Sequence, residues 1–598
     1  MTIYYSIEEG INYLPIRKDN SITIGLDLIC QSITDLVSDP KKKNYLLGFD
    51  GYMGVEWHPI ISRLKKIAKQ KNLNIEFINM NSYYKSLPEI NKIISSYLNL
   101  EPDFGYVYKK GFKEFLDLKK IENLKITLLK FKKTPIPDRK KIIICYGCGT
   151  VIPQFRKIFD QIFYFDITRE QLFNRFEKNP TIFLGSQGDK ISTKQFLQKF
   201  YYVDSQILDK HKKYVLKYMD WYVDSNSTHK LKLIPRKAYN ALFSELVQKP
   251  FLIKMLYYPT SWGGNWLKKI KKLPEKMQNS GQGFLLENEN SIKIKFNSLS
   301  IEIPFQNFLW KESKRILGEK VIKKCGEKFP FAYWYDDSIK GGPMAIQVHP
   351  PGNYLKKKFN ELIRQDESYY ILQTNPGAKT YLGLKEDAEV KELEQKAIES
   401  NIKKKSFDYK KFINSIDSTP GDYLLIPAGT IHASGMNQVV VEIDWVVTAY
   451  SPGYTFHIYD YLRKDLDGSL RPIHIEHSFN VLKKNRKTKW VLKKLKQKPK
   501  LLKSSNEGLE YLLGSRYDMP FEVHRLEFEK EMQIDTKGTL NVLTLVEGES
   551  ILVQSQENIN YQCKLYFPNT LIVPASIGKY TIINLGNKPC KILKALVK

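Results

Sequence analysis

Cysteine and long apolar runs are scarce in this sequence. Six cysteines stand at irregular positions among 598 residues, which argues against a disulfide-stapled scaffold and fits a reducing compartment. No apolar run reaches the length of about 20 residues that crosses a bilayer. The stretch MTIYYSIEEG lacks the basic and apolar regions of a secretion signal. We therefore expect a cytoplasmic protein with no membrane partner.

Acidic residues are outnumbered, since 94 Lys and Arg face 64 Asp and Glu and leave a formal charge of +30. A basic face can bind nucleic acid through release of counterions. Here the lysines are spread along the chain, outnumber the arginines and alternate with acidic residues. We interpret the charge as a general enrichment in lysine that bears on solubility. It favours anionic substrates such as sugar phosphates, and we predict no nucleic-acid partner.

The length exceeds what one hydrophobic core can hold, so several domains are expected. Residues 1–235 alternate apolar strand patterns with helical ones, and four of the predicted strands are NYLLGFDG, LNIEFINM, KKIIICYGCG and QIFYFD. Such alternation is typical of a doubly wound α/β domain with a parallel sheet.

After about residue 250 the pattern changes to short strands with glycine turns, for example GDYLLIPAG and NQVVVEIDWVV. This pattern predicts an antiparallel barrel or sandwich. A charged helical insertion at 386–415 interrupts it, and a basic connector at 482–504 leads to a last strand-rich block. We predict an all-β metal-binding domain at 236–505 and a second barrel at 506–598.

The stretch MAIQVHPPG, residues 344–352, places Gln347 and His349 two positions apart. On a strand, both side chains then lie on one face. Glu367 precedes another apolar strand, and His432 follows a strand and a Pro-Ala-Gly turn. Amide and carboxylate oxygens with two imidazoles form a plausible donor set for zinc or a similar divalent ion. A solvated strand face is the other interpretation, and spacing alone leaves both open.

The segment GDYLLIPAGTIHASGMN resembles the second cupin motif, and Gln-Val-His-Pro resembles the first motif of class I mannose-6-phosphate isomerases. PTSWGGNWL and YDYLRKDLDGSLRPIHIEH resemble two further signatures of that family. The resemblance spans about residues 250–598. It implies cupin (double-stranded β-helix) barrels and one Zn²⁺ or other divalent ion per chain, held by Gln347, His349, Glu367 and His432. It also implies interconversion of mannose 6-phosphate and fructose 6-phosphate, or of a related sugar phosphate.

Two positions depart from that family. Gln365 stands where the family has a lysine, and His457 stands where it has an arginine before the Tyr-Asp signature. Because the substrate phosphate needs a cation, Arg364, Arg463 and Lys464 are candidate replacements. We take Gln365, His457 and Arg463 as the candidate catalytic residues. The alternatives are a sugar-phosphate sensor without catalysis and a bifunctional kinase–isomerase.

The segment GFDGYMGVEWHP, residues 48–59, follows an apolar strand and precedes a helical pattern. It resembles a shortened P-loop of nucleoside and uridine kinases. A working P-loop ends in Gly-Lys-Ser/Thr, whose lysine reaches the phosphates, whereas Val55 and Glu56 stand near that place here. We therefore predict a degenerate, non-catalytic kinase-like domain at 1–235.

Overall fold

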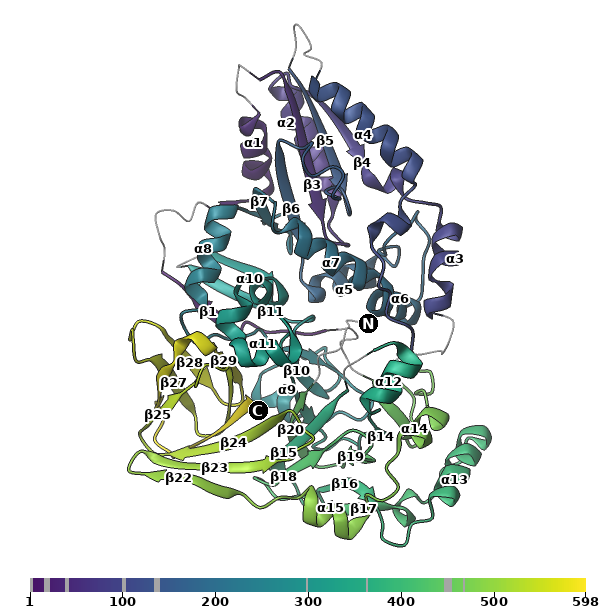
Figure 1. Cartoon of the computed structure of the whole chain (residues 1–598), viewed down its shortest axis with the longest axis vertical. Coiled ribbons are helices and arrows are strands. Elements are labelled where there is room, and N and C mark those ends of the chain that lie inside the picture. Colours follow the sequence, from purple (N-terminus) through teal and green to yellow (C-terminus); the bar gives the residue numbers. More distant parts are fainter. Residues whose placement is uncertain are drawn as a thin grey trace. The chain divides into compact units, whose positions relative to one another are not determined.

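The computed structural model describes residues 4–15, 22–37, 42–98, 104–133, 140–296, 299–361, 364–445, 454–465 and 468–598. The chain forms two compact units (Figure 1). The first unit contains residues 1–3, 13–244 and 293–310, and the second contains residues 4–12, 245–292 and 311–598. The chain passes between the units within β1 (Ile11–Tyr13) and β11 (Ser291–Phe296), and β12 (Leu299–Pro304) lies in the first unit.

The first unit is built on a seven-stranded sheet in the order β2-β8-β7-β6-β3-β5-β4. The five strands from β7 to β4 run parallel, and β8 and β2 pair antiparallel at the other edge. The predicted parallel sheet is present. Its central strands are continuous buried apolar runs, as expected where helices cover both faces. The strands are β2 (Thr23–Ile24), β3 (Asn44–Gly51), β4 (Asn74–Asn79), β5 (Lys141–Gly147), β6 (Gln161–Asp166), β7 (Trp221–Asp224) and β8 (Lys232–Pro235).

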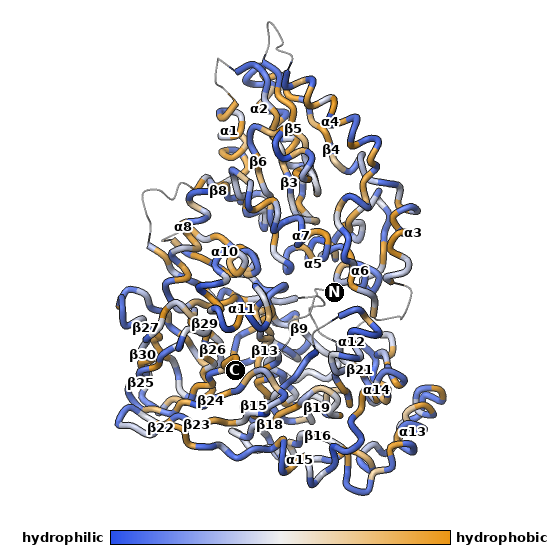
Figure 2. Tube along the Cα trace, in the orientation of Figure 1, coloured by the Kyte–Doolittle hydropathy of each residue, from blue (hydrophilic) through white to orange (hydrophobic). Residues whose placement is uncertain are grey.

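The helices of the first unit are amphipathic, as the blue and orange alternation along α4 in Figure 2 shows. In α2 the apolar residues recur at helical spacing, and the buried ones lie on one face. The helices are α1 (Leu26–Leu36), α2 (Trp57–Gln70), α3 (Leu87–Leu98), α4 (Leu118–Lys133), α5 (Arg169–Lys178), α6 (Thr193–Lys199) and α7 (Ser205–Val215). Helices α8 (Arg236–Leu246) and α10 (Phe305–Leu317) begin in the first unit.

The second unit holds two pairs of antiparallel sheets, which we call the first and second sheet pair. The first pair has a six-stranded sheet, β18-β15-β20-β13-β10-β9, and a five-stranded sheet, β17-β16-β19-β14-β21. Its strands are β9 (Leu256–Tyr258), β10 (Gln282–Leu285), β13 (Phe331–Asp337), β14 (Ile346–Val348), β15 (Asp366–Thr374), β16 (Lys379–Leu384), β17 (Ile413–Asp417), β18 (Tyr423–Ile426), β19 (His432–Ser434), β20 (Gln438–Trp445) and β21 (Phe456–Tyr459).

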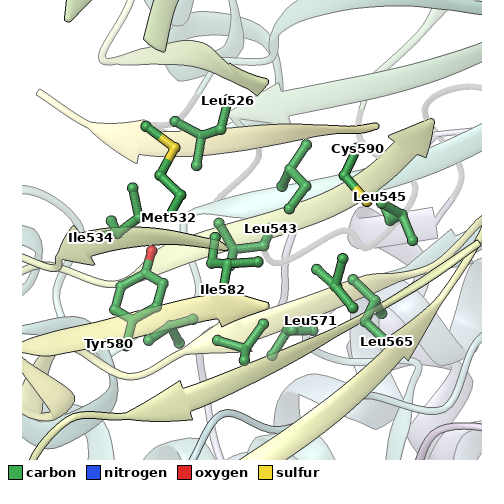
Figure 3. Packing of buried hydrophobic residues seen from close by; sticks show 14 of the residues in the cluster. Leu526, Met532, Ile534, Leu543, Leu545, Leu565, Leu571, Tyr580, Ile582 and Cys590 are labelled. Carbon is green, nitrogen blue, oxygen red and sulfur yellow. The ribbon is translucent and has the colours of Figure 1, made fainter. Parts of the chain in front are cut away.

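The second sheet pair is filled by aliphatic side chains such as Leu543, Leu571 and Ile582 (Figure 3). Its sheets have the orders β22-β23-β24-β31-β26-β29 and β25-β30-β27-β28. The strands are β22 (Lys500–Ser505), β23 (Gly508–Ser515), β24 (Phe521–Phe528), β25 (Glu531–Asp535), β26 (Asn541–Glu547), β27 (Ser550–Ser555), β28 (Gln562–Tyr566), β29 (Thr570–Val573), β30 (Lys579–Asn584) and β31 (Cys590–Val597).

Helices of the second unit lie mainly in connections of the first sheet pair: α9 (Trp266–Ile270), α11 (Glu319–Cys325), α12 (Gly352–Phe359), α13 (Val390–Lys403), α14 (Ile475–Val481) and α15 (Thr488–Lys494). The charged insertion predicted at 386–415 contains α13. None of the helices in the described ranges combines the length and the apolarity that a bilayer crossing requires. All six cysteines are free.

The compact units differ in extent from the predicted ranges. The first unit continues past 235 to Ser244 and regains Lys293–Trp310. The rest of the range predicted as 236–505 lies with 506–598 in the second unit, because the two sheet pairs pack on each other. Tyr335 and Thr570 share a hydrogen bond of 2.8 Å between hydroxyls, and the rings of Phe331 and Phe521 meet edge to face at 5.9 Å.

Candidate metal centre

The four predicted metal ligands come together inside the first sheet pair. Gln347 lies on β14, His349 directly follows that strand, and His432 begins β19, all in the five-stranded sheet. Glu367 lies on β15 of the six-stranded sheet. Gln347 is the direct cross-strand partner of His432, so their side chains share a face. The cluster therefore joins the inner faces of both sheets.

The carboxylate of Glu367 bridges the two imidazoles. Its Oε1 lies 2.5 Å from His349 Nε2, and its Oε2 lies 2.8 Å from His432 Nε2. The carboxamide nitrogen of Gln347 lies 3.3 Å from His432 Nε2. Glu367, His349 and His432 are each at most 1% exposed. The donor atoms of His349, Glu367 and His432 lie close enough together to hold one ion.

Backbone carbonyls orient both imidazoles. Nδ1 of His349 lies 3.0 Å from the carbonyl oxygen of Tyr454, and Nδ1 of His432 lies 2.9 Å from that of Thr430. A carbonyl only accepts hydrogen bonds, so each Nδ1 carries the proton and donates it. The lone pair of each neutral ring is then on Nε2, which points at Glu367. Metal-binding histidines are held in this way.

This arrangement needs a cation between its members. A lone pair facing a carboxylate oxygen at under 3 Å is repulsive unless a proton or a metal ion lies between them. His349 Nε2 and Glu367 Oε2 are buried and have no hydrogen bond of good geometry within the described part of the chain. Since the contacts are short but poorly aligned for hydrogen bonds, the donor set fits a metal ion such as zinc, with N and O ligands.

The pKa shifts of Glu367 and His349 reflect the attraction between the carboxylate and the imidazoles. Burial alone would raise the pKa of Glu367, but the two neighbouring imidazoles lower it below its ordinary value. Burial alone would lower the pKa of His349, and the Glu367 carboxylate raises it instead. Protons and a divalent ion therefore compete for the same donors.

Two of the three candidate catalytic residues face this cluster. Gln365 donates from Nε2 to Glu367 Oε1 at 2.9 Å and to Asp444 Oδ2 at 3.1 Å. His457 is the cross-strand partner of Gln347 on the side opposite His432. Its ring therefore lies on the metal-facing side of β21, and its Nδ1 lies 3.1 Å from the carbonyl oxygen of Pro472.

Arg463, the third candidate, lies in the loop after β21. Its guanidinium donates to the carbonyl oxygen of Pro343 at 2.8 Å and forms a close ion pair with Asp460. It lines a pocket with residues of α13 and of the segments 458–463 and 470–473. No contact between Arg463 and the metal ligands is found among the described residues.

Sequence reasoning missed a set of buried carboxyl groups beside Glu367. Asp444 is the cross-strand partner of Glu367, and Glu442 and Asp336 lie nearby with at most 5% exposure. Burial raises the pKa of Asp336 to about 6, and burial with neighbouring carboxylates raises those of Glu442 and Asp444. The signal was available: two acids two positions apart in the apolar run QVVVEIDW point to the same buried face.

In the first unit, the loop predicted to be P-loop-like connects β3 to α2, in the strand–loop–helix order that such loops have. Its Glu56 lies 3.8 Å from Arg175 and accepts a close hydrogen bond from Thr228. Arg175 also donates to the carbonyl oxygen of Gly54 at 2.7 Å. These contacts hold the loop by side chains of the unit itself.

Known proteins match two parts of the chain. A family model described as a domain of unknown function (DUF8485) matches residues 25–248. The probable mannose-6-phosphate isomerase GmuF of Bacillus subtilis is 24% identical over 335 residues, which cover 56% of this chain and 96% of that protein. The mannose-6-phosphate isomerase of Streptococcus mutans is 26% identical over 235 residues, covering 39% and 68%.

Among solved structures, a zinc-bound mannose 6-phosphate isomerase is 14% identical and covers 58% of this chain and 99% of its own, with a TM-score of 0.43. The resemblance of the first unit to kinases finds no support in these comparisons. Over about half its length, the chain is similar to mannose-6-phosphate isomerases.

Proposed function

We propose that the second unit is a zinc-dependent aldose–ketose isomerase that interconverts mannose 6-phosphate and fructose 6-phosphate or a related sugar phosphate. The observation that carries the proposal is the buried set of Gln347, His349, Glu367 and His432, in which Nε2 of both imidazoles faces one carboxylate. The similarity to mannose-6-phosphate isomerases over 335 residues supports the substrate class.

These four residues would hold the ion. Bound zinc supplies Lewis-acid polarisation of sugar oxygens, which stabilises the negative charge that develops when a proton leaves the neighbouring carbon. The chain's own task is to orient the ligands and to move that proton. Gln365 orients Glu367 with one hydrogen bond and Asp444 with another. The buried carboxyl group of Asp444, whose pKa is raised, can hold a proton beside the site.

His457 is our candidate for contact with the sugar phosphate. It lies beside Gln347 on the metal-facing side of the sheet and is only partly buried. A protonated imidazole can pair with a phosphate oxygen, whereas a neutral one can only donate a hydrogen bond. Gln365 carries no charge and cannot take that role.

The test is an isomerisation assay on zinc-loaded protein with mannose 6-phosphate and several other phosphorylated aldoses. We expect slow turnover, because the metal set is complete while Gln365 and His457 replace permanent cations. If zinc-loaded protein binds these sugars and converts none of them, the sensor function replaces the isomerase. His432→Ala serves as the control, because activity that persists in it does not depend on the ion.

For the first unit we propose a degenerate kinase-like domain that transfers no phosphate. Val55 and Glu56 stand near where a P-loop has its lysine and hydroxyl, and the loop at 52–56 is tied to Arg175 and Thr228. A bifunctional kinase–isomerase finds no support in the comparisons. We propose the cytoplasm as the compartment, since six free cysteines suit reducing conditions.

A further inference from the structure

A turn at residues 427–430 lies between β18 and β19 and contacts two of the four metal-binding residues. The carbonyl oxygen of Thr430 accepts the hydrogen bond from Nδ1 of His432 at 2.9 Å. The amide of Gly429 donates to the carbonyl oxygen of His349 at 2.8 Å. The position of this turn therefore affects where both imidazoles lie and how the ring of His432 is oriented.

The same turn is linked to the carboxylate of the metal centre. The amide of Ala428 donates to Oδ1 of Asp366 at 2.9 Å, and Nε of Arg364 donates to Oδ2 of that carboxylate at 2.7 Å. Asp366 directly precedes Glu367 on β15. A displacement of the turn would thus be felt at all three titratable side chains that hold the ion.

The guanidinium of Arg486, from the segment between α14 and α15, binds this turn. Its Nη1 atom donates to the carbonyl oxygens of Pro427 at 2.6 Å and Ala428 at 2.9 Å, and it makes a close hydrogen bond to the hydroxyl of Thr430. That hydroxyl in turn donates to the carbonyl oxygen of Pro427 at 2.6 Å. Because a guanidinium is planar and its donors have fixed directions, these contacts fix the geometry of the turn.

The segment that carries Arg486 approaches the turn closely because Gly429 has no side chain. Gly429 has a φ of +89°, and a Cβ atom at this position would lie 2.7 Å from Cγ of Lys483 and 3.0 Å from the carbonyl oxygen of Val481. The amide of Lys483 donates to the carbonyl oxygen of Gly429 at 2.9 Å. A larger residue at 429 would push this segment, and with it Arg486, away from the turn.

Arg486 keeps this position although its surroundings disfavour its charge. Burial, together with the neighbouring Arg516, lowers the pKa of Arg486 to about 10. Both guanidinium groups lie over the ring of Trp490, at 5.6 Å for Arg486 and 5.3 Å for Arg516. A charge withdrawn from water needs hydrogen-bond partners, and the three oxygen atoms of the turn supply them. The charged group and the turn therefore stabilise each other.

We propose that Arg486 is a positioning residue of the metal centre, which fixes the 427–430 turn and thereby orients His432 towards the ion. Loss of an outer partner of a metal-binding histidine weakens metal binding by about 10- to 100-fold. Arg486 acts through Thr430 and lies one contact further out, so its effect should be at the lower end of that range. The inference rests on the metal centre of the proposed function and does not require isomerase activity.

The chain offers a matched pair of arginines on the two sides of one tryptophan ring. Arg486→Ala removes the guanidinium that binds the turn, and Arg486→Lys keeps the charge without the planar group. Arg516→Ala is the control, because Arg516 shares the Trp490 contact and its side chain bonds to Asp518 at 2.9 and 3.0 Å.

Three measurements are made on the full-length protein at one fixed pH, since protons compete with the ion for its ligands. Zinc affinity is measured by competition with a chromophoric chelator. The stability of the metal-free protein is measured by thermal unfolding. The visible absorption spectrum of the cobalt(II)-loaded protein reports the geometry of the ligands, which a loss of stability alone would not change.

We expect Arg486→Ala to bind zinc about tenfold more weakly than the wild type and to alter the cobalt spectrum, with Arg486→Lys between the two. Guanidinium chloride at a non-denaturing concentration should restore the zinc affinity of Arg486→Ala, whereas sodium chloride at the same ionic strength should not. Arg516→Ala should lose thermal stability and keep both the zinc affinity and the cobalt spectrum of the wild type.

The inference is refuted if Arg486→Ala binds zinc as tightly as the wild type, or if Arg516→Ala weakens zinc binding to the same extent. Should Arg486→Ala fail to fold, Arg486→Lys decides in its place, and wild-type affinity in that variant refutes the role of Arg486. A wild type that binds no zinc would refute the metal centre and this inference with it. Unchanged affinity in the Arg486 variants would refute this inference alone.

Discussion

Replacing His432 with alanine should strip the metal and leave the fold intact. His432 is fully buried, and its Nε2 lies 2.8 Å from Glu367. Loss of an outer partner of a metal ligand already weakens binding 10- to 100-fold, so loss of the ligand itself should exceed 100-fold, or about 2.7 kcal/mol. The cavity left by the ring should lower the free energy of unfolding by a further 2–4 kcal/mol.

The assay is zinc content by elemental analysis after dialysis at a free zinc concentration that saturates the wild type. A second readout is thermal unfolding with and without a chelator, because a bound ion stabilises the folded state by mass action. The wild type should lose stability on chelation and His432→Ala should not. His477→Ala, a buried histidine of α14 in the same unit, is the matched control and should keep its zinc. Full zinc occupancy in His432→Ala would refute the ligand set.

Three further predictions concern catalysis, pH and the first unit. Gln365→Lys combined with His457→Arg should raise turnover of mannose 6-phosphate in a coupled assay, because both changes supply cations; an unchanged or lower rate would count against their roles. The hydrogen bond from His524 lowers the pKa of Glu510 to about 2, and although burial acts to lower the pKa of His524, its carboxylate neighbours raise it above 6.5. Glu510 therefore stabilises the fold above pH 4.5 and loses this as pH falls towards 2, while His524 stabilises it below pH 6.5 and loses this as pH rises through its raised pKa. The free energy of unfolding in urea should be highest between pH 4.5 and 6.5, by about 1–2 kcal/mol over its values outside this range, and His524→Gln should remove this maximum. An unaltered pH profile in that variant would contradict the assignment. Without a P-loop lysine, and with Glu56 nearby, the protein should transfer no phosphate from ATP to nucleosides or hexoses, and measurable transfer by wild type would overturn this.

Features that depend on local spacing could be predicted from the sequence. The strand NYLLGFDG is β3 residue for residue, because a parallel strand buried on both faces is one apolar run. Gln347 and His349 share a face because a strand has a period of two. The side chains they meet depend on register, which only the folded chain sets. Neither the pairing of Glu367 with Asp444 nor the place of Arg463 outside the metal centre could be predicted locally.

The sequence also did not predict that residues 293–310 belong to the first unit. The sequence at the start of a helix such as α10 does not indicate the sheet on which the helix packs. Within that unit, Asn307 donates to Asp166 at 2.7 Å, at the end of β6. The partner lies 141 positions earlier in the chain, and no pattern of composition or spacing connects the two.

The exchange of segments between the units has a consequence for biosynthesis. The hydrogen bond to Asp166 cannot form until Asn307 has been translated. In the second unit, Asn12 exchanges two hydrogen bonds of 2.8 Å with the backbone of Leu252. A ribosome that has translated the 244 residues ending at Ser244 has therefore made most of the first unit without its closing segment. The translated chain also includes residues 4–12, which belong to the second unit, whose other residues have not yet been synthesised. The first unit cannot be completed before residues 293–310 are translated, and a single cut between residues 244 and 293 would leave each unit without one of its segments.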